Sequence, residues 1–532
     1  MSAARAHRPA RRRLGLDRFE AATLLALATL SVVVLASLLA RVWVRGGLVS
    51  GADGYVVVDQ MQYVAWLRQA ADHVGAGNLF DLMPGSRSLV HPGVVISGLV
   101  HRLGVDEVVA YQLWKPVAVA LLFAGALLYS RRFLPGLADR RLALVLALFA
   151  TSPVAAAIAW AGLAGAKAKT QVDFLTGELW TGTYLWGYPF TAIAVGAMPL
   201  GLLAYERGRA QGSRAMLAWA AAAGLLVSWL QPWQGATYAL VLIGAEALIV
   251  ARRGRPARAA AIDLLGPLAA TALPLGYYYV LGRSDPSWEL AQQANDLARW
   301  PLWVIVVGLA PLAIPAALAY RGAGLDFGGL ALRLWPIVGV VVFYLPLGTF
   351  PFHAFQGLTL PLVVLGVIAL RRGLGSRPLP LALAGALVLV LVVPGTAYRG
   401  EQIRGAIVKA LQPFYLETGE RDALRHLERL PERGGVLAPY YSGQLLPAYT
   451  GRETWVGAVS WTPAFKRRTF EAEALFSGRA DRRSAEALVR RSGARFLLSD
   501  CQARSDISAL VERVAGPPRR FGCAAVYRVA PE

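Results

Sequence analysis

Long apolar runs alternate with short polar segments over most of the chain. The first run, AATLLALATLSVVVLASLLARVWV, starts at residue 21. A hydrocarbon core of about 30 Å needs roughly 20 helical residues, so this run is long enough to cross a bilayer. Comparable runs recur up to residue 397 and predict about eleven membrane spans. The predicted spans cover residues 21–44, 110–130, 142–162, 185–205, 214–231, 234–251, 261–281, 301–320, 330–349, 354–370 and 379–397.

Arginines cluster in the segments that separate alternate spans. Examples are SRRF, ARRGRPAR and ALRRGLGSR, whereas SWLQPWQGATY and GTFPFHAFQG carry no Lys or Arg. Because loops on the cytoplasmic side are enriched in Lys and Arg, the alternation predicts that the basic segment 1–20 is cytoplasmic. With an odd number of spans, the region 398–532 is expected outside. The expected location is the plasma membrane, crossed many times.

Composition agrees with a membrane protein and argues against a nucleic-acid partner. Of the 532 residues, 56% are hydrophobic and only 16% are charged, where soluble domains average about 25%. The formal net charge of +21 lies in short clusters between apolar runs. A basic groove for nucleic acid would gather that charge on one face of a folded domain.

The first outer loop, residues 45–109, is the longest loop of the predicted membrane domain 21–397. In its stretch DQMQYVAWLRQA, the side chains of Tyr63 and Trp66 follow helical spacing and form an apolar stripe, from which Gln62 points away. This pattern predicts an amphipathic helix that lies in the membrane interface and contacts the lipid bilayer.

Two carboxylates of this loop are candidates for chemistry. Asp59 stands where the amphipathic helix begins, and there it either caps the helix or acts as a functional acid. Asp53 is the second candidate, although the surrounding GADG favours a turn. Farther on, His91 precedes Pro92, a residue suited to the first position of a helix, and a second interfacial or re-entrant helix is expected there.

Other predicted outer loops hold further polar and aromatic groups. Lys167 and Lys169 either anchor the chain at the interface or meet a lipid phosphate. The nearby aromatic residues are typical of an interfacial belt and also suit stacking on a sugar. In SWLQPWQGATY, the glutamines either belong to a tight hairpin around Pro232 or bond to hydroxyl groups of a substrate.

These segments together resemble the GT-C superfamily of membrane glycosyltransferases. An N-terminal span is followed by an outer loop with DQMQYVAWLRQA and then LVHPGVVISGLVHRLG, as in protein O-mannosyltransferases and the aminoarabinose transferase of lipid A. The tail, with GGVLAPYYSGQLLPAYTGRETWVGAVSWTPAFKRR and SGARFLLSDC, is similar to the outer domain of bacterial cell-envelope members.

The resemblance implies a donor, a base and an open question about metal. Its members take a sugar from a polyprenyl phosphate in the outer leaflet, and an acid of the first loop serves as the base. That role falls on Asp59, with Asp53 as the alternative. Gln60 stands where a second acid is common, so no cofactor is assigned and the need for a divalent cation stays open.

The expected chemistry is transfer of the sugar to a glycan, lipid or protein acceptor. A sugar phosphate leaves without protonation, whereas an acceptor hydroxyl needs a base, and one carboxylate suffices. The departing phosphate needs cations. Candidates for the donor phosphate are Lys167, Lys169, Arg283 and His353. Candidates for binding the sugar or the acceptor are Gln62, Tyr63, His91, Glu178, Trp180, Gln231, Trp233 and Gln234.

From residue 398 the composition becomes that of a soluble domain. The stretches GGVLAPYY, ARFLLSDC and CAAVYRV read as strands, and RSAEALVRRSG and DISALVERVAG read as helices, which predicts a small α/β domain. Cys501 ends one strand and Cys523 begins the next. If these strands are antiparallel neighbours, the sulfurs meet at one end of the sheet, and a disulfide is expected outside the cytosol; two free buried thiols are the alternative.

Two other functions compete with the enzyme. A transporter or flippase of lipid-linked glycans would place polar groups near the membrane midplane on matching halves, and neither polar midplane groups nor an internal repeat is evident. A non-catalytic membrane assembly protein is the third reading.

Overall fold

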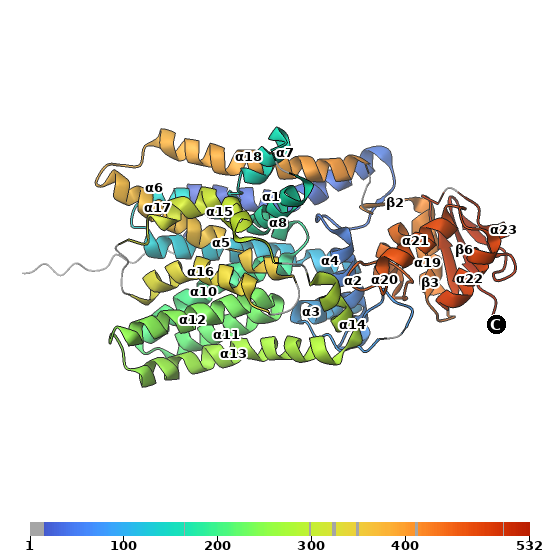
Figure 1. The fold of residues 1–532 in the computed structure, drawn as a ribbon, viewed down its shortest axis with the longest axis horizontal. Coiled ribbons are helices and arrows are strands. Elements are labelled where there is room, and N and C mark those ends of the chain that lie inside the picture. Colours follow the sequence, from blue (N-terminus) through green and yellow to red (C-terminus); the bar gives the residue numbers. More distant parts are fainter. Residues whose placement is uncertain are drawn as a thin grey trace, which may run out of the picture.

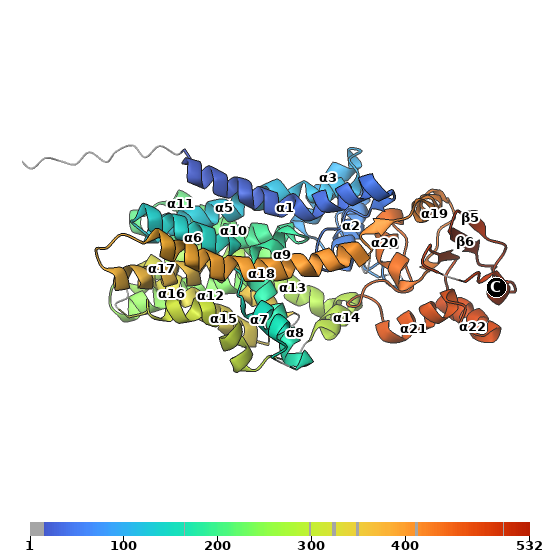
Figure 2. The same cartoon turned by 90° about the horizontal axis from the view of Figure 1, so that it is seen from above.

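The computed structural model describes residues 15–83, 85–163, 165–296, 299–321, 326–346, 350–409, 413–503 and 505–531. The predicted cytoplasmic segment 1–20 therefore lies largely outside the described residues. A long helical bundle carries a small α/β region at one end, and this arrangement is seen from both directions (Figures 1 and 2). The predicted class, a mainly helical membrane protein with a C-terminal region containing a sheet, is confirmed at this level.

The bundle is built from helices that follow the apolar runs. Its elements are α1 (Arg18–Arg45), α5 (Trp114–Phe133), α6 (Leu137–Phe149), α7 (Val154–Ala161), α8 (Ala166–Leu179), α9 (Thr181–Leu185), α10 (Pro189–Gln211), α11 (Arg214–Leu230), α12 (Pro232–Ala251), α13 (Ala257–Ser284), α14 (Pro286–Asn295), α15 (Leu302–Ala317), α16 (Phe327–Tyr344), the 3-10 helix η1 (Pro351–Phe355), α17 (Thr359–Leu374) and α18 (Leu381–Lys409). Proline is the first residue of α10, α12 and α14. The N–H groups of a helix's first turn have no partner within the helix, so proline, which lacks an N–H, costs no hydrogen bond there.

The number of helices that could cross a membrane is smaller than the predicted count of about eleven. Within the described residues, eight helices have the length and composition of a span, and a ninth results if the bent pair α6 and α7 is one span. That pair bends by 53° at a break that contains Pro153. The predicted spans 214–231 and 301–320 coincide with α11 and α15, which are apolar but shorter.

Three short helices fill the first outer loop: α2 (Val57–Asp72), α3 (Pro92–Arg102) and α4 (Glu107–Gln112). The expected contact of α2 with the lipid bilayer is corrected, because most of its residues are buried in protein, including Gln62 on the side expected to be polar. One face of α2 packs on α3 and another on α20 (Tyr440–Thr450) of the C-terminal region. The helix is thus an internal support between the bundle and that region (Figure 1).

The last bundle helix extends farther than the predicted boundary at residue 397. In Figure 2, α18 runs along the bundle toward the C-terminal region, and it ends at Lys409. Pro394 and Gly395 lie inside it without ending it. The polar turn that follows stays helical because Arg399 and Gln402 bond to Asp173 on α8.

The C-terminal region contains a four-stranded sheet of order β3-β4-β6-β5. Its strands are β3 (Val436–Leu437), β4 (Phe496–Ser499), β5 (Arg519–Phe521) and β6 (Ala524–Arg528), and its remaining helices are α19 (Thr418–Arg429), α21 (Phe465–Phe476), α22 (Arg482–Ser492) and α23 (Ser508–Val511). β3 is parallel to β4, whereas β6 is antiparallel to both β4 and β5. β5 is a strand that the sequence analysis did not predict.

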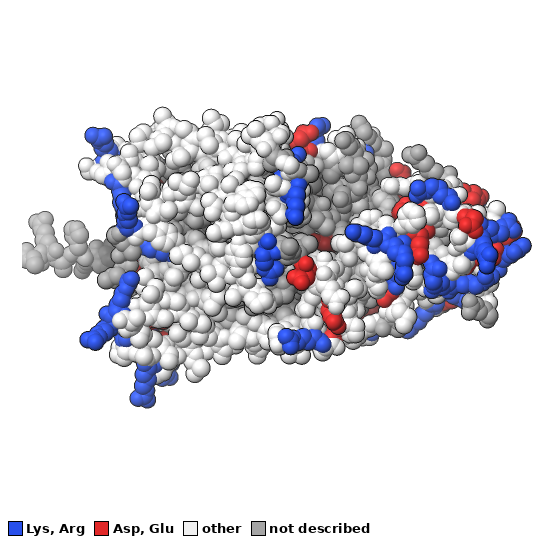
Figure 3. Space-filling model, in the orientation of Figure 1, with Lys and Arg blue, Asp and Glu red and all other residues white. Residues whose placement is uncertain are grey.

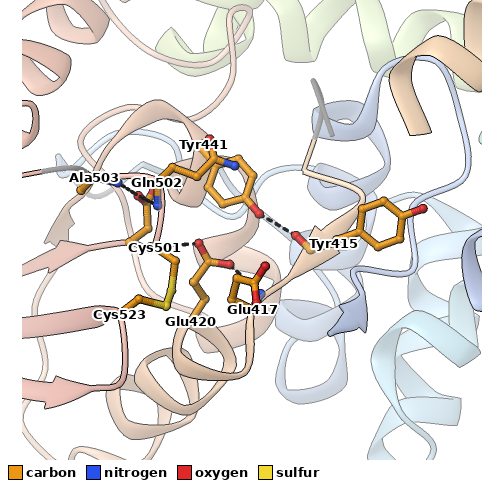
Figure 4. Close-up of a disulfide and its surroundings, with 9 residues drawn as sticks. Tyr415, Glu417, Glu420, Tyr441, Cys501, Gln502, Ala503 and Cys523 are labelled. Atoms are coloured by element: carbon orange, nitrogen blue, oxygen red, sulfur yellow. Dashed lines mark hydrogen bonds between the residues drawn. A yellow bond between two sulfur atoms is a disulfide. The ribbon is translucent and has the colours of Figure 1, made fainter. Parts of the chain in front are cut away.

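A disulfide joins Cys501 to Cys523 (Figure 4). The antiparallel pairing of β4 with β6 brings both residues to one end of the sheet, with Ser499 opposite Ala525. Glu420 on α19 accepts a hydrogen bond from the backbone N–H of Cys501 at 3.1 Å. Burial raises the pKa of this carboxyl to about 7.

Strand pairing and helix packing both join the C-terminal region to the bundle. β1 (Leu48–Val49), directly after α1, pairs antiparallel with β2 (Tyr415–Leu416), directly before α19. The packing of α2 against α20 also joins them. Residues far apart in the sequence therefore meet where the bundle ends.

Charge divides the molecule along its long axis. Figure 3 shows Lys and Arg gathered at the bundle end away from the C-terminal region and over that region itself, with a broad uncharged band of bundle surface between them. At the far end, Arg132 bonds to both Glu206 on α10 and Asp326, the N-cap residue of α16. An uncharged band flanked by basic ends is the surface expected of a bilayer-spanning protein.

Candidate functional site

A cavity of about 1270 Å³ lies where the bundle meets the C-terminal region. Its walls come from α2, α8, α12, α13, α14, η1 and α18, and from the segment 459–461 of the C-terminal region. Ligand pockets usually measure about 300–1,000 Å³, so this cavity has room for a large ligand or for two substrates side by side.

Asp59 lines the cavity from the first turn of α2. It is half-buried, and the hydroxyl of Tyr188 donates a hydrogen bond to its Oδ2 at 2.8 Å. Burial raises the pKa of Asp59, and the hydrogen bond from Tyr188 and the nearby His353 only partly oppose this. The capping bonds of the alternative reading are not seen, since no side chain caps α2 and its N-cap residue is Val56. A carboxylate with a raised pKa is a stronger proton acceptor once ionised.

Asp53 lies outside the cavity in a buried ion pair. The ammonium of Lys115 on α5 approaches its Oδ2 to 2.6 Å and also donates to the carbonyl oxygen of Ser31 at 2.8 Å. Gln60 Nε2 donates to Asp53 Oδ1 at 2.9 Å, while its Oε1 accepts the backbone N–H groups of Asp53 and Gly54. The amide at position 60 thus needs both a donor and an acceptor, which explains why a carboxylate does not stand there.

A second polar cluster also lines the cavity. Glu178 Oε2 lies 3.0 Å from His353 Nδ1 and accepts a hydrogen bond from Gln356 Nε2 at 2.6 Å. Gln231 Nε2 donates to Gln356 Oε1 at 3.0 Å. Gln234 lies behind this cluster and donates to the carbonyl oxygen of His353 at 2.9 Å. The bonds fix the position of His353 on the cavity wall.

Cations reach the cavity from two helices. Arg283 at the end of α13 is exposed and lies over the ring of Tyr279 at 4.4 Å. Arg399 on α18 is buried, pairs with Asp173, and donates to Thr176 Oγ1 at 2.9 Å. Guanidinium groups at a cavity wall favour an anionic ligand such as a phosphate.

Three tryptophans from three separate segments meet at the end of the cavity nearest the C-terminal region. Trp66 lies on α2, Trp288 on α14 and Trp461 in the segment before α21. The centroid distances are 6.1 Å between Trp66 and Trp288, 5.5 Å between Trp66 and Trp461, and 5.0 Å between Trp288 and Trp461. We call these residues the tryptophan triad.

Nine of the residues singled out in the sequence line the cavity. They are Asp59, Gln62, Tyr63, His91, Glu178, Gln231, Trp233, Arg283 and His353. The cavity lining does not include Asp53, Lys167, Lys169, Trp180 or Gln234. Both lysines are exposed on the first turns of α8, and Trp180 packs on Trp186 in the core. Their expected contacts with substrate are therefore not supported by their positions.

Several lining residues were missed by the sequence analysis. Tyr188 directly precedes Pro189, and Arg399 follows the last apolar run by two residues. A charged residue directly after an apolar run on the outer side was a usable signal for Arg399. The partnership of Tyr188 with Asp59 left no signal, because 129 positions separate the two residues.

The side chains near Asp59 do not form a set of metal ligands. Within the described ranges, no three His, Cys, Asp or Glu residues lie close enough together to hold a metal ion. Gln60, where the resembled family often has an acid, is bonded to Asp53 instead.

No protein-family model and no curated protein sequence matches the chain, but solved structures do. The apo oligosaccharyltransferase of Archaeoglobus fulgidus matches with a TM-score of 0.52 at 12% identity, over 94% of this chain and 73% of that one. ArnT from Cupriavidus metallidurans, bound to undecaprenyl phosphate, matches with a TM-score of 0.50 at 12% identity, over 96% of this chain and 98% of that one.

A third structure is the same archaeal oligosaccharyltransferase tethered to an acceptor peptide that contains the NVT sequon. It matches with a TM-score of 0.51 at 13% identity, over 97% of this chain and 74% of that one. These neighbours are membrane glycosyltransferases of the GT-C superfamily. At this identity the likeness concerns the fold, and the chain has the GT-C fold.

Proposed function

We propose that this GT-C-fold chain transfers a sugar from a polyprenyl phosphate to an acceptor hydroxyl, with Asp59 as the general base. The observation that carries the proposal is a single cavity that holds both a carboxylate suited to accept a proton and cationic groups suited to a phosphate. Its volume, about 1270 Å³, suits a donor and an acceptor together.

The proposed step begins with both substrates in the cavity. The ionised carboxylate of Asp59 takes the proton of the acceptor hydroxyl as the hydroxyl oxygen bonds to the anomeric carbon. The bond between that carbon and the phosphate oxygen breaks, and its electron pair leaves with the polyprenyl phosphate. No general acid is needed because the phosphate leaves as an anion.

The remaining polar side chains stabilise that charge and hold the base. Arg283 and Arg399 attract the departing phosphate, and His353, fixed by Glu178, lies in the same cavity. Tyr188 binds one carboxylate oxygen of Asp59, Oδ2, which orients Oδ1 for the proton. The Asp59 base of the sequence analysis is thus retained, while Arg399 replaces the lysines among the candidates for phosphate.

The structural neighbours support the classes of donor and acceptor. ArnT, whose fold the chain shares, is described bound to undecaprenyl phosphate, and the archaeal oligosaccharyltransferase is described with a tethered acceptor peptide. We extend a polyprenyl-phosphate donor to this chain on that basis. The acceptor is addressed in the next subsection.

We also propose that the cavity faces the outer side of the plasma membrane. The cavity lies at the bundle end that carries the C-terminal region, opposite the bundle end where the basic residues of the short helix connections gather (Figure 3). Basic residues favour the cytoplasmic side of a membrane, so the opposite end is expected to be extracytoplasmic.

The test is Asp59→Asn in purified protein given a panel of undecaprenyl-phosphate monosaccharides, with release of undecaprenyl phosphate as the measurement. Loss of the base should lower kcat by about 10²–10⁴-fold. The matched control is Asp72→Asn, which changes an exposed carboxylate on the same helix and should leave kcat unchanged. Unchanged turnover in the Asp59 variant would remove Asp59 from the mechanism. Movement of the lipid across vesicles without sugar transfer would support a flippase instead.

A further inference from the structure

We propose that the tryptophan triad, together with Gln62 and His91, forms a subsite for a neutral sugar ring of a glycan acceptor. The role as acceptor rests on the proposed glycosyl transfer, whereas binding of the sugar to this subsite does not.

The triad is held in place from three sides. Asn78 donates to the carbonyl oxygen of Trp461 at 2.8 Å, and Asn295 on α14 donates to Ser460 Oγ at 3.0 Å. Asp285 caps the helix that carries Trp288 by accepting the N–H of Ser287 at 2.8 Å. The rings therefore form a surface that exists before a ligand binds, which lowers the entropy lost on binding.

The three indole rings are inclined to one another, so their faces point in more than one direction. Trp461 stands nearly perpendicular to both other rings, at 90° to Trp66 and 87° to Trp288. Trp66 and Trp461 are each only 7% exposed, and the cavity borders both. An indole face is a large apolar surface that suits the C–H face of a sugar ring.

Two hydrogen-bonding groups on the adjacent wall lack partners. Gln62 is 7% exposed, and its Nε2 has no hydrogen-bond partner among the described residues. His91 is 4% exposed, and its Nε2 also lacks a partner there. Because a buried unpartnered donor is costly, such groups point to a ligand that supplies acceptors.

The protonation state of His91 defines what it offers. Its Nδ1 accepts the backbone N–H of Val94 at 3.3 Å, and burial lowers its pKa to about 3. The ring is therefore neutral with its proton on Nε2, which makes Nε2 a donor. Its ring centroid lies 6.1 Å from that of Tyr63, one residue after Gln62 on the same helix. The Tyr63 centroid also lies 5.5 Å from that of Trp66, so His91 is connected to the triad through the Tyr63 ring, and both unpartnered donors line the same cavity.

The spacing along α2 relates this patch to the proposed base. Three or four positions separate Asp59 from Gln62 and Tyr63, and the same spacing separates those two residues from Trp66, so they lie along one side of α2. All four line the cavity. Seven residues of helix separate Asp59 from Trp66 by about 10 Å along the axis. One sugar ring does not span that distance, so an oligosaccharide should bind the triad while its terminal hydroxyl reaches Asp59.

The groups around the triad favour a neutral carbohydrate over other occupants. Beside the rings the cavity wall carries Ser460, Asn295 and Gln292, which are uncharged and bond to hydroxyl groups. A prenyl or acyl chain would leave Gln62 Nε2 and His91 Nε2 without partners. A cationic ligand held by cation–π contacts would be favoured by a carboxylate at the rings, and the lining residues beside them are neutral.

The test uses purified protein on an array of neutral and acidic oligosaccharides, without any lipid donor, so that binding is separated from transfer. We expect neutral oligosaccharides to bind, and Trp461→Ala to weaken binding of the strongest one by at least tenfold, as for a buried aromatic contact. Gln62→Ala tests the same subsite without removing a ring and should also weaken binding. Trp43→Ala, which changes a 91% exposed ring on α1, is the matched control.

The outcomes separate this proposal from the proposed function. Triad-dependent glycan binding together with full activity of Asp59→Asn would keep the subsite and refute the base. Loss of activity in Asp59→Asn with unchanged glycan affinity in Trp461→Ala and Gln62→Ala would refute the subsite and keep the enzyme. Absence of glycan binding, or displacement of the bound oligosaccharide by a peptide or by lipid A, would overturn the sugar subsite.

Discussion

Replacing Tyr188 with phenylalanine should change the pH at which the enzyme loses activity in acid. In the proposed mechanism, proton transfer to Asp59 requires the ionised carboxylate, so activity should fall as the pH drops through the pKa of Asp59. Burial already raises that pKa, while the hydrogen bond from Tyr188 Oη to Oδ2, at 2.8 Å, lowers it by stabilising the charged form. Removing the hydroxyl therefore raises the pKa further, and the acid limb moves to higher pH.

The size of the change follows from the strength of the lost bond. A hydrogen bond to a charged group contributes about 1.5–3 kcal/mol, and one pKa unit corresponds to about 1.4 kcal/mol, so the limb should move up by about one to two pH units. The assay is kcat/KM against pH for release of undecaprenyl phosphate, because this ratio reports ionisations of the free enzyme. The value at high pH should fall much less than the value in acid.

The matched control is Tyr344→Phe. The hydroxyl of Tyr344 donates to the carbonyl oxygen of Trp300 at 2.9 Å and does not touch Asp59, so its removal should leave the limb in place. An unmoved limb in Tyr188→Phe would show that Asp59 does not titrate in the acid limb, and the reasoning on the base would fail.

Three further predictions concern stability and donor binding. Lys115→Met leaves the buried carboxylate of Asp53 without its cation and should lower the free energy of unfolding by about 3–5 kcal/mol, measured as a lower Tm. Replacing both Cys501 and Cys523 with alanine opens a loop of 22 residues and should cost about 3 kcal/mol, and reduction should then lower the Tm of the parent but not of the variant. Arg283→Ala should lower kcat/KM for the lipid donor by about tenfold or more, since it removes a charged contact to the phosphate.

Controls for these predictions come from exposed residues. Arg482 pairs with Glu512 on the surface of the C-terminal region, and Arg482→Ala should change the Tm little. Arg252→Ala removes an exposed cation after α12, at the end away from the cavity, and should leave donor kinetics unchanged. A large change in Tm for Arg482→Ala, or in donor kinetics for Arg252→Ala, would contradict the assigned contacts. Absence of all three effects predicted above would contradict them as well.

Local physics made much of the fold predictable. Apolar runs longer than about 17 residues have few stable environments other than a bilayer, so α1, α12 and α13 were placed from hydropathy alone. In the C-terminal region, apolar stretches bounded by turns identified β3, β4 and β6. The exposed strand β5, with the sequence RRF, lacks that apolar signal and was missed.

Pairings across the chain were not predictable from local pattern. The apolar stripe on α2 was read as facing lipid, but it faces protein, because nothing in the segment itself shows that α20 will cover it. Likewise, Asp53 and Lys115 are 62 residues apart, and each alone looks like an ordinary charged residue. The residues of the site could be proposed singly, whereas their convergence required the three-dimensional structure.

The strand order of the C-terminal sheet has a consequence for how the molecule matures. β6, which ends at Arg528, is an inner strand between β4 and β5, so the sheet cannot close until that stretch has been synthesised. Trp461 follows a segment that is bonded to this sheet through Trp455 and Val436. Under the proposed topology, the segment that carries Trp461 reaches the pocket only after it has crossed the membrane, so the pocket gains its third indole after α2 and α14 are in place.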